Sequence, residues 1–334
     1  VTGVQTCALP ILYITLAKEE IKKFQEFIPV WIMTPENMIR NLEISEDMFD
    51  VVIFDNANDM NLFSMSALFR AKKAIVFGDE NQANIEKSIQ DNKKTKLFAK
   101  KYLYDIPNWQ WINMKTSIYS TALRVFPVTV SLKENFRSPS EITNFSNNLC
   151  YSGKVLSTKS QGAFGELWSS IKTVNVNGKR ERENQINLVE AEAIVDTVVK
   201  CCQNPLYRNM SMGVISLLGD EQGEVIQNLL EKKLGQDKIR ERNILCGNPY
   251  TFQGEERDVI FLSMVISNNI KFATLTKDSD VRRFNIACSR AKKQMWLFHS
   301  VELEDMSKDC IRYKLLDYCK NFKIINKKDN TKIA

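Results

Sequence analysis

Short, continuous apolar runs recur along this 334-residue chain, and each is followed by a polar or acidic residue. They lie at 51–54, 74–77, 213–215, 259–265 and 295–298. Strands with one buried face alternate apolar and polar residues, whereas strands buried on both faces are apolar throughout. The pattern therefore predicts parallel strands that are covered by helices on both sides.

Amphipathic segments between these runs predict the covering helices. Residues 184–202 have apolar side chains near helical spacing, and residues 219–234 begin with Asp220 as a candidate N-cap. Alternation of strands and helices over this length predicts an α/β protein with two lobes, whose ligands bind at the carboxyl ends of the strands. The stretch 83–121, rich in lysine and asparagine, is expected to be the irregular end of the first lobe.

Composition excludes several classes of protein. No apolar run approaches the ~20 residues of a membrane-spanning helix, so no membrane partner is expected. The eight cysteines form no C-x-x-C pair and there is a single histidine, His299, which argues against a zinc site and for reduced thiols in a cytoplasmic protein. His299 ends an apolar run and is expected to be structural. The net charge of +6 is compatible with a polyanionic partner but does not establish one.

The first residues do not resemble a targeting signal. The first basic residue, Lys18, follows the apolar stretch instead of preceding it. Residues 1–11 resemble a translated sequencing adaptor, so native sequence is expected to begin near Leu12.

Two predicted strands of the first lobe end in acidic residues. Asp55 follows the run 51–54, and Gly78 and Asp79 follow the run 74–77, with Gln82 close behind. Phosphoryl-transfer enzymes hold magnesium with an aspartate in such a position. Taken alone the signal is weak, because any parallel strand can end in aspartate, and Gln82 could be an ordinary turn residue.

Five segments occur in a fixed order, and together they resemble a known family. The order is VIFDNAND, GDENQ, ENFRSPSEI, FQGEERDVIFLS and RRFNIACSRAK. They are similar to motifs II to VI of the superfamily 1 helicases of the Upf-like branch, whose patterns include FQGxERD and RRxNVAxSRAK. The similarity extends from about Trp31 to Tyr318, and its last two segments are the most specific.

The resemblance implies two RecA-like lobes with parallel sheets, the first of them incomplete. The expected organisation is a non-native leader at 1–11, a partial first lobe at 12–127, a second lobe at 128–322 and a polar tail at 323–334. Some relatives carry a nuclease-like domain downstream. The oligomeric state cannot be read from the sequence.

The resemblance also implies an ATP site between the lobes. Asp55 would hold Mg²⁺ through a water ligand, and Gln82 would report the γ-phosphate. Arg137 and Arg290 would stabilise the charge of the transition state. The remaining residues expected to bind the nucleotide are Gln253, Gly254 and Glu255, the last on the sugar.

Single-stranded DNA or RNA is the partner that the resemblance implies. Its backbone would contact Thr34, Pro35, Ser216 and Thr251, with binding that depends on salt and little on sequence. Trp109 and Trp111 could stack on bases, but core packing is the favoured interpretation.

Two departures from the family pattern affect the expected activity. No G-x-x-x-x-G-K-[ST] phosphate loop is present in the sequence, so the chain is expected to be a fragment that lacks it. Asn56 occupies the place of the family's catalytic glutamate, and loss of a general base typically costs ~10²–10⁴ in rate. Residues 83–85 also replace the family's L-P-P.

Three hypotheses follow from the sequence. The chain is the C-terminal part of an ATP-dependent helicase or translocase, or it is an ATPase-impaired nucleic-acid-binding module of the same fold. The third, weakest option is an unrelated nucleotide-binding α/β protein.

Overall fold

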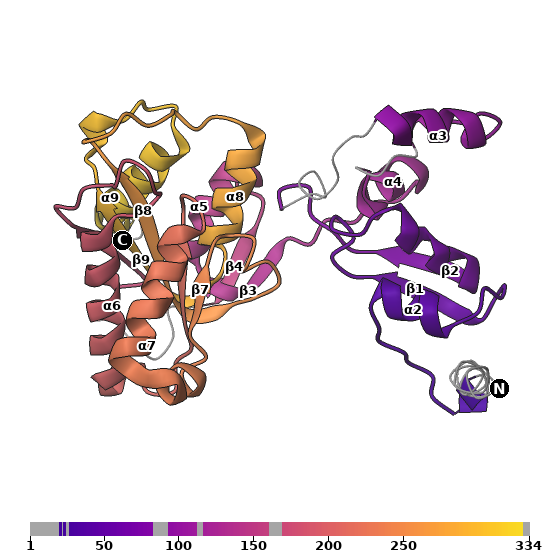
Figure 1. The fold of residues 1–334 in the computed structure, drawn as a ribbon, viewed down its shortest axis with the longest axis horizontal. Coiled ribbons are helices and arrows are strands. Elements are labelled where there is room, and N and C mark those ends of the chain that lie inside the picture. The colour runs from indigo at the N-terminus through magenta and orange to yellow at the C-terminus, as the bar shows by residue number, and fades with distance from the viewer. Residues whose placement is uncertain are drawn as a thin grey trace, which may run out of the picture. The chain divides into compact units, whose positions relative to one another are not determined.

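The computed structural model describes residues 20–21, 23–24, 27–82, 93–111, 116–159 and 169–329, which form two compact units (Figure 1). The first unit comprises residues up to 80 and 84–129, and the second comprises 81–83 and residues from 130 onward. Residues 81–83 belong to the second unit because the Asn81 amide donates to the Cys150 carbonyl at 3.2 Å, and the Asn81 carbonyl accepts from Asn285 at 2.9 Å. The predicted leader at 1–11 lies outside the described residues.

A pair of parallel strands forms the centre of the first unit. Phe54 at the end of β1 pairs with Val76 at the end of β2, and a 3-10 helix leads from one strand toward the other. The buried core includes Met38, Leu42 and Ile118. The elements are α2 (Pro35–Asn41), β1 (Phe49–Phe54), η1 (Leu62–Arg70), β2 (Ala71–Val76), α3 (Lys93–Leu103), η3 (Trp109–Trp111) and α4 (Ile118–Val125).

One face of this strand pair is exposed although its side chains are apolar. Val51, Ile53 and Ile75 are all exposed, while the other face carries the buried Phe54. The prediction of burial on both faces is therefore wrong for β1 and β2, because no described element of the first unit covers this face.

The second unit contains a five-stranded sheet in which every pairing is parallel. The strand order is β5-β9-β8-β6-β7, which confirms the α/β class with a parallel sheet. A second parallel pair, β3 and β4, belongs to the same unit. The strands are β3 (Glu134–Pro139), β4 (Leu156–Lys159), β5 (Ile171–Asn175), β6 (Met212–Ser216), β7 (Leu245–Gly247), β8 (Arg257–Ser267) and β9 (Ala291–Ser300).

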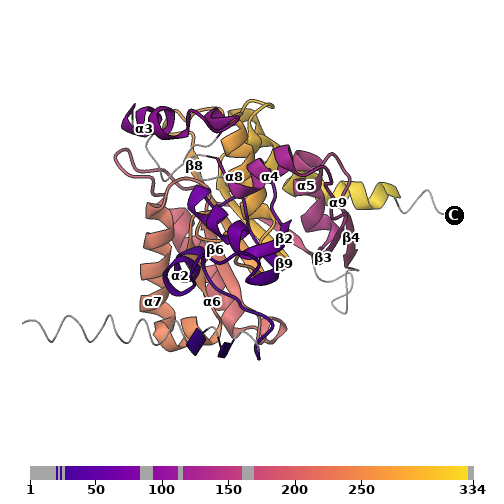
Figure 2. The same cartoon turned by 90° about the vertical axis from the view of Figure 1, so that its right-hand side faces the viewer.

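Helices cover both faces of the five-stranded sheet. Helices α6 and α7 pack on one face, and α5, α8 and α9 pack on the other, so that two separate cores form (Figure 2). Every residue of β6 is buried, as its continuous apolar run predicts. The helices are α5 (Ser140–Cys150), α6 (Leu188–Gln203), α7 (Glu221–Glu241), α8 (Asp278–Cys288) and α9 (Ile311–Asp329), with 3-10 turns η5 (Pro205–Tyr207) and η6 (Leu303–Asp305).

Three predictions about helices need correction. Asp220 stands at the N-cap of α7 but caps no backbone N–H, because its carboxylate accepts from Asn248 instead. The stretch expected to be irregular contains α3, and α9 continues to Asp329, inside the expected polar tail. By contrast, a helix forms in the predicted stretch 184–202: α6 begins at Leu188, and the Asn187 side chain caps it by accepting from the Glu190 N–H at 3.2 Å.

The described residues also bear on the expectations from composition. No helix in the described ranges is long and apolar enough to cross a membrane. Seven cysteines lie in those ranges, and all are free thiols. His299 is buried, its Nδ1 lies 2.8 Å from the Val301 carbonyl, and burial lowers its pKa, which agrees with a structural role.

A buried carboxyl group fixes the carboxyl ends of β8 and β9. Glu190 of α6 accepts from the Ser263 hydroxyl at 2.6 Å, the Val265 N–H at 2.9 Å and the Ser300 hydroxyl at 3.1 Å. Val265 has a φ of +66°, an unfavourable backbone conformation for a β-branched residue. The bond from Glu190 to its N–H therefore holds a strained residue in place at the end of the sheet.

Burial raises the pKa of Glu190 from 4.5 to about 7. The folded state holds this proton to a higher pH than the unfolded chain does, so the protonated carboxyl group of Glu190 stabilises the fold. This contribution is complete below about pH 4.5 and is lost as the pH rises through 7. We expect Glu190→Gln to remove this pH dependence, since a glutamine amide can accept from Val265 and donate to a hydroxyl. Glu190→Ala should cost about 3 kcal/mol at pH 5, because it leaves buried donors unpaired, and less at pH 8, where the wild type has lost the contribution of the protonated carboxyl group. Urea unfolding between pH 5 and 8 measures this, and parallel profiles for wild type and Glu190→Gln would contradict it.

Candidate functional site

The first unit brings its two acidic strand ends together. Asp55 directly follows β1 and is exposed, and the loops after the two strands are joined by bonds from the Ala57 N–H to the Phe77 carbonyl, 2.8 Å, and from the Asp79 N–H to the Asn58 side chain, 3.1 Å. Gly78 is required here, because a Cβ at this position would lie 2.4 Å from the Tyr119 ring. Parallel pairing of β1 and β2 thus places Asp55 and Asp79 at one edge.

Asn56 occupies a turn with a special backbone conformation. Its φ is +57°, in the left-handed region that asparagine tolerates better than most residues. Its side-chain amide donates to the Asp59 carboxylate at 2.8 Å. Asn56 therefore has a structural function in this loop, and a glutamate here would carry backbone strain.

The donor set around Asp55 fits a magnesium ion that is held mainly by a phosphate ligand. Mg²⁺ commonly keeps several waters and uses only one or two protein carboxylates beside phosphate oxygens. Asp55 supplies one exposed carboxylate. Within the described ranges, no three carboxylate, histidine or cysteine groups gather into a site that could bind a metal by themselves.

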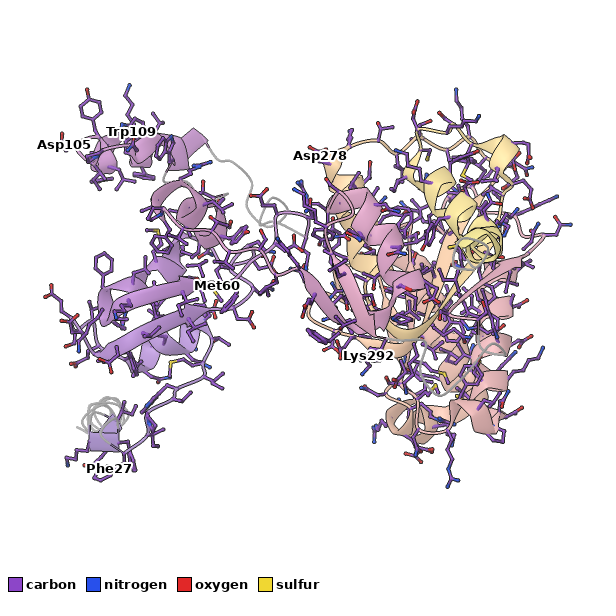
Figure 3. All side chains as sticks on the ribbon, turned by 180° about the vertical axis from the view of Figure 1, so that it is seen from behind. Phe27, Met60, Asp105, Trp109, Asp278 and Lys292 are labelled. Carbon is purple, nitrogen blue, oxygen red and sulfur yellow. The ribbon has the colours of Figure 1, made fainter. Side chains whose placement is uncertain are left out.

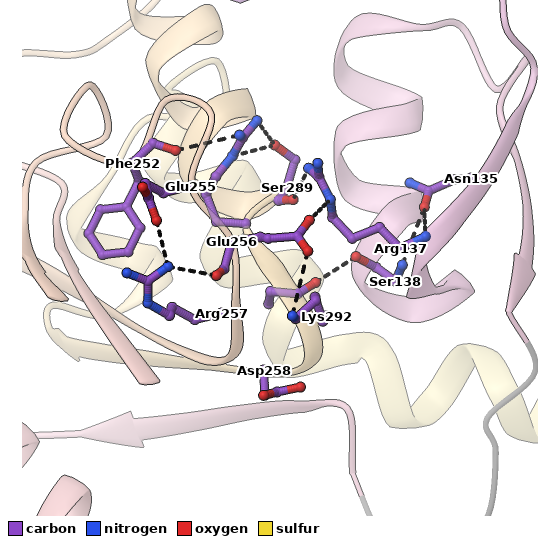
Figure 4. Close-up of polar contacts among 12 residues, drawn as sticks. Asn135, Arg137, Ser138, Phe252, Glu255, Glu256, Arg257, Asp258, Ser289 and Lys292 are labelled. Atoms are coloured by element: carbon purple, nitrogen blue, oxygen red, sulfur yellow. Dashed lines mark hydrogen bonds and ion pairs between the residues drawn. The ribbon is translucent and has the colours of Figure 1, made fainter. Parts of the chain in front are cut away.

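In the second unit, three distant motifs meet at the amino ends of β8 and β9 (Figure 4). The Arg137 Nε of β3 lies 2.7 Å from the Glu256 carboxylate, and the Lys292 ammonium lies 3.5 Å from the other oxygen of that carboxylate. Arg137 also donates to the Ser289 carbonyl at 3.3 Å, and Ser138 donates to the Ala291 carbonyl at 2.5 Å. The Arg137 side chain is 40% exposed, so its guanidinium is held in position at the surface.

Arg290 is arranged differently from Arg137. It is only 3% exposed, and it donates to the Ile286 carbonyl at 3.0 Å, the Ser289 hydroxyl at 2.9 Å and the Phe252 carbonyl at 3.5 Å. A cation bound to the last carbonyls of a helix satisfies groups that have no partner within the helix. In this structure Arg290 therefore caps α8, and its predicted role at ATP stays a prediction.

The segment FQGEERD places its two glutamates differently. Glu255 pairs with Arg257 at 2.7 Å, whereas Glu256 binds the predicted catalytic residue Arg137. Gly254 has a φ of +77°, which a residue with a side chain rarely adopts. Sequence reasoning missed Glu256, although the family pattern FQGxERD has its glutamate at this position. Glu256 therefore joins Gln253, Gly254 and Glu255 as a candidate residue, and the roles predicted for these three at the nucleotide stay predictions.

The predicted strand-binding residues of the second unit lie at the opposite, carboxyl edge of the sheet. Thr251 is exposed and lines a pocket of about 550 Å³ together with Asn248, Asp220 and Glu224. Ser216, at the end of β6, is fully buried, and its hydroxyl donates to the Leu218 carbonyl at 2.9 Å. The structure thus exposes Thr251 but encloses the Ser216 side chain.

One loop joins the pocket to the arginine cluster. Residues 248–256 leave β7 at the carboxyl edge and enter β8 at the amino edge. Midway, the buried Phe252 ring packs over Gly213 of β6, where a Cβ would lie 2.6 Å from the ring. The Phe252 carbonyl also accepts a hydrogen bond from Arg290. The loop therefore runs from one edge of the sheet to the other and is held at its middle residue, Phe252, by the packing of the ring and by this bond.

Three predicted residues remain to be placed. Thr34 caps α2 of the first unit by accepting from the Asn37 N–H at 3.3 Å, and Pro35 begins that helix. Gln82 lies in the short segment 81–83 that belongs to the second unit. None of these contacts tests their predicted roles.

Comparison with known proteins identifies a family and several relatives. The AAA domain family model AAA_12 matches residues 114–302. The chain is 25% identical over 321 residues to the uncharacterised ATP-dependent helicase MG140 of Mycoplasma genitalium, covering 90% of this chain and 28% of that protein. It is 24% identical over 220 residues to the DNA polymerase alpha-associated DNA helicase A of Saccharomyces cerevisiae, covering 57% of this chain and 31% of that one. The chain thus spans less than a third of these relatives.

Two solved structures are similar at low TM-scores. One is the C-terminal domain of a possible DNA helicase from Lactobacillus plantarum, with a TM-score of 0.32, 13% identity, and coverage of 54% of this chain and 94% of that one. The other is an arterivirus nonstructural protein 10 helicase in complex with DNA, with a TM-score of 0.34, 12% identity, and coverage of 77% and 42%. The fold assignment rests on the strand order described above.

Proposed function

The chain belongs to the AAA domain family, its helicase relatives bear out the resemblance to the Upf-like branch of superfamily 1, and from this premise we propose that it is the motor part of an ATP-dependent helicase or translocase. The phosphate-binding loop, absent from the sequence, would come from an upstream segment. We call this chain together with such a segment the complete protein.

The observation that carries the proposal is the meeting of three motifs at one surface. Arg137 comes from β3, Glu256 from the loop that enters β8, and Lys292 from β9, yet they form one ion-paired cluster. A surface ion pair of this kind contributes only about 0–1 kcal/mol, so stability alone gives little reason for its arrangement. Orientation of a guanidinium toward a phosphate is a function that such a cluster can serve.

The chain's own residues support a division of labour at ATP. Asp55 would hold the magnesium ion that accompanies the phosphates, and the ion would supply positive charge against that of the transferred group. Gln82 would contact the γ-phosphate. Glu256 and Lys292 hold the Arg137 guanidinium at the surface of the second unit, where it would stabilise developing negative charge. Asn56 cannot accept a proton from water, so hydrolysis is slow.

The carboxyl edge of the second unit is the proposed contact with single-stranded DNA or RNA. Thr251 is exposed there, whereas Asp220 and Glu224 would repel phosphates and accept hydrogen bonds from base amino groups or ribose hydroxyls. The 248–256 loop then couples strand binding at this edge to the position of the arginine cluster, because Phe252 fixes the middle of the loop. Thr34 and Pro35 of the first unit are proposed as further backbone contacts.

A second function is favoured by Asn56 alone. The asparagine is built into its turn by the bond to Asp59, so the protein would keep strand binding with little hydrolysis. In that case the chain is part of an ATPase-impaired binding module of the same fold.

Displacement of streptavidin from a 3′- or 5′-biotinylated single strand tests the proposal. With the complete protein we expect faster displacement when ATP and Mg²⁺ are present than when either is omitted, because translocation consumes ATP. Strand binding without ATP-dependent displacement supports the binding module instead. Absence of both strand binding and displacement contradicts both functions.

A further inference from the structure

Helix α3 and the turn after it carry a surface that the motor assignment does not use. From Lys93 to Tyr104 the sequence has five lysines and no acidic residue. The helix spans Lys93–Leu103, and η3 follows at Trp109–Trp111. Because aromatic residues at 98, 102 and 104 are interspersed among the lysines, this segment differs in character from an ordinary solvated face.

The aromatic side chains of α3 form an exposed stacked pair. Phe98 and Tyr102 are one helical turn apart, with ring centroids at 6.1 Å and an interplanar angle of 20°. They are 58% and 66% exposed, respectively. The Lys101 ammonium lies 5.0 Å from the centre of the Tyr102 ring, so a cation accompanies the pair.

The turn after α3 extends this arrangement. The Tyr104 and Trp109 rings lie 6.5 Å apart, and the Arg124 guanidinium of α4 lies 5.6 Å from the centre of the Trp111 ring. Trp111 is exposed, which contradicts the expectation that it packs in the core. Figure 3 labels Trp109 and Asp105 at this end of the helix, where side chains stand out from the ribbon.

We propose that α3 and η3 form a second binding surface for single-stranded nucleic acid, separate from the Thr251 edge. Stacking on Phe98 and Tyr102 binds bases of any sequence, and the lysines attract the phosphate backbone. Charge decides between this partner and an apolar protein segment, because residues 93–111 carry five lysines against one acidic residue, Asp105, and such an excess of positive charge favours a polyanion. The inference rests on the proposed function for its partner but not for its location.

Leu97 provides a matched control for the stacking residues. It lies on the same helix, is 66% exposed and is apolar, yet it has no aromatic face. We expect Phe98→Ala/Tyr102→Ala to weaken binding of the chain to fluorescent dT20 and rU20 by about tenfold, whereas Leu97→Ala binds like wild type. Lys100→Gln/Lys101→Gln should reduce the slope of log K against log salt by about 1.4.

The outcomes separate this inference from the motor assignment. Circular dichroism shows whether each variant keeps its helices, and the lysine variant remains informative if the aromatic one does not fold. If Thr251→Glu weakens binding while the α3 variants do not, the inference is wrong and the proposed function stands. Equal losses for Leu97→Ala and Phe98→Ala/Tyr102→Ala, or binding to phosphatidylserine vesicles in place of the oligonucleotides, also overturn the inference. No oligonucleotide binding by wild type contradicts both proposals.

Discussion

Replacing Arg137 by alanine in the complete protein is expected to lower kcat for strand-stimulated ATP hydrolysis by about 10³-fold or more. An arginine that stabilises the transition state of phosphoryl transfer contributes a factor of this size. The thermal stability should hardly change, because the side chain is partly exposed and its pair with Glu256 lies at the surface. Steady-state hydrolysis at saturating ATP and single strand, together with thermal melting, measures both effects.

Lys292→Ala is the matched control for this substitution. Lys292 pairs with the same carboxylate at 3.5 Å and is also a partly exposed cation, so its removal should change kcat only a few-fold. Arg290→Ala is a poor control, because Arg290 is buried and bonds to Ile286, Ser289 and Phe252, so that its loss lowers stability as well. Equal losses of activity for Arg137→Ala and Lys292→Ala would contradict a specific role for Arg137.

Replacing Asn56 by glutamate should raise the rate of ATP hydrolysis by the complete protein about 10²-fold. The substitution restores a carboxylate where the family has its general base, and such a group contributes ~10²–10⁴. The same change should destabilise the protein by about 1–2 kcal/mol, because glutamate is strained at the φ of +57° that asparagine adopts here. Hydrolysis rates and urea unfolding give the two numbers.

Asn56→Asp separates the two contributions to this result. Aspartate tolerates the left-handed backbone as asparagine does, but its carboxylate is one methylene shorter and lies beside Asp59, which already accepts a bond from residue 56. We expect little strain and a smaller gain in rate. If the wild type already hydrolyses ATP rapidly and Asn56→Glu leaves the rate unchanged, the interpretation of Asn56 as an impaired site is wrong.

Apolar patterning predicted the three central strands of the second unit. The runs at 213–215, 259–265 and 295–298 became β6, β8 and β9 at the centre of a parallel sheet. The same pattern in β1 and β2 failed to predict burial, because burial depends on what else packs against a strand and that information is not in the strand itself. Helix α3 was missed because its lysines and aromatics do not form the apolar stripe of a core-facing helix.

The site shows a similar division between motif and geometry. Motif order predicted that Arg137 and the FQGEERD segment act together, and the ion pair to Glu256 agrees with this. The sequence could not predict that Arg290 is enclosed while Arg137 is exposed, since both are arginines beside serine and only the tertiary fold decides their partners. The burial of Ser216 was invisible for the same reason.

Strand-stimulated ATP hydrolysis by the complete protein tests the central claim most directly, namely that this chain is the motor of an ATP-driven protein that acts on single strands. The account predicts that the rate rises with the concentration of single-stranded oligonucleotide and saturates, that Asn56→Glu raises the plateau, and that Arg137→Ala removes the response. A rate that does not respond to single strands in either the wild type or Asn56→Glu, or an undiminished response in Arg137→Ala, would contradict it.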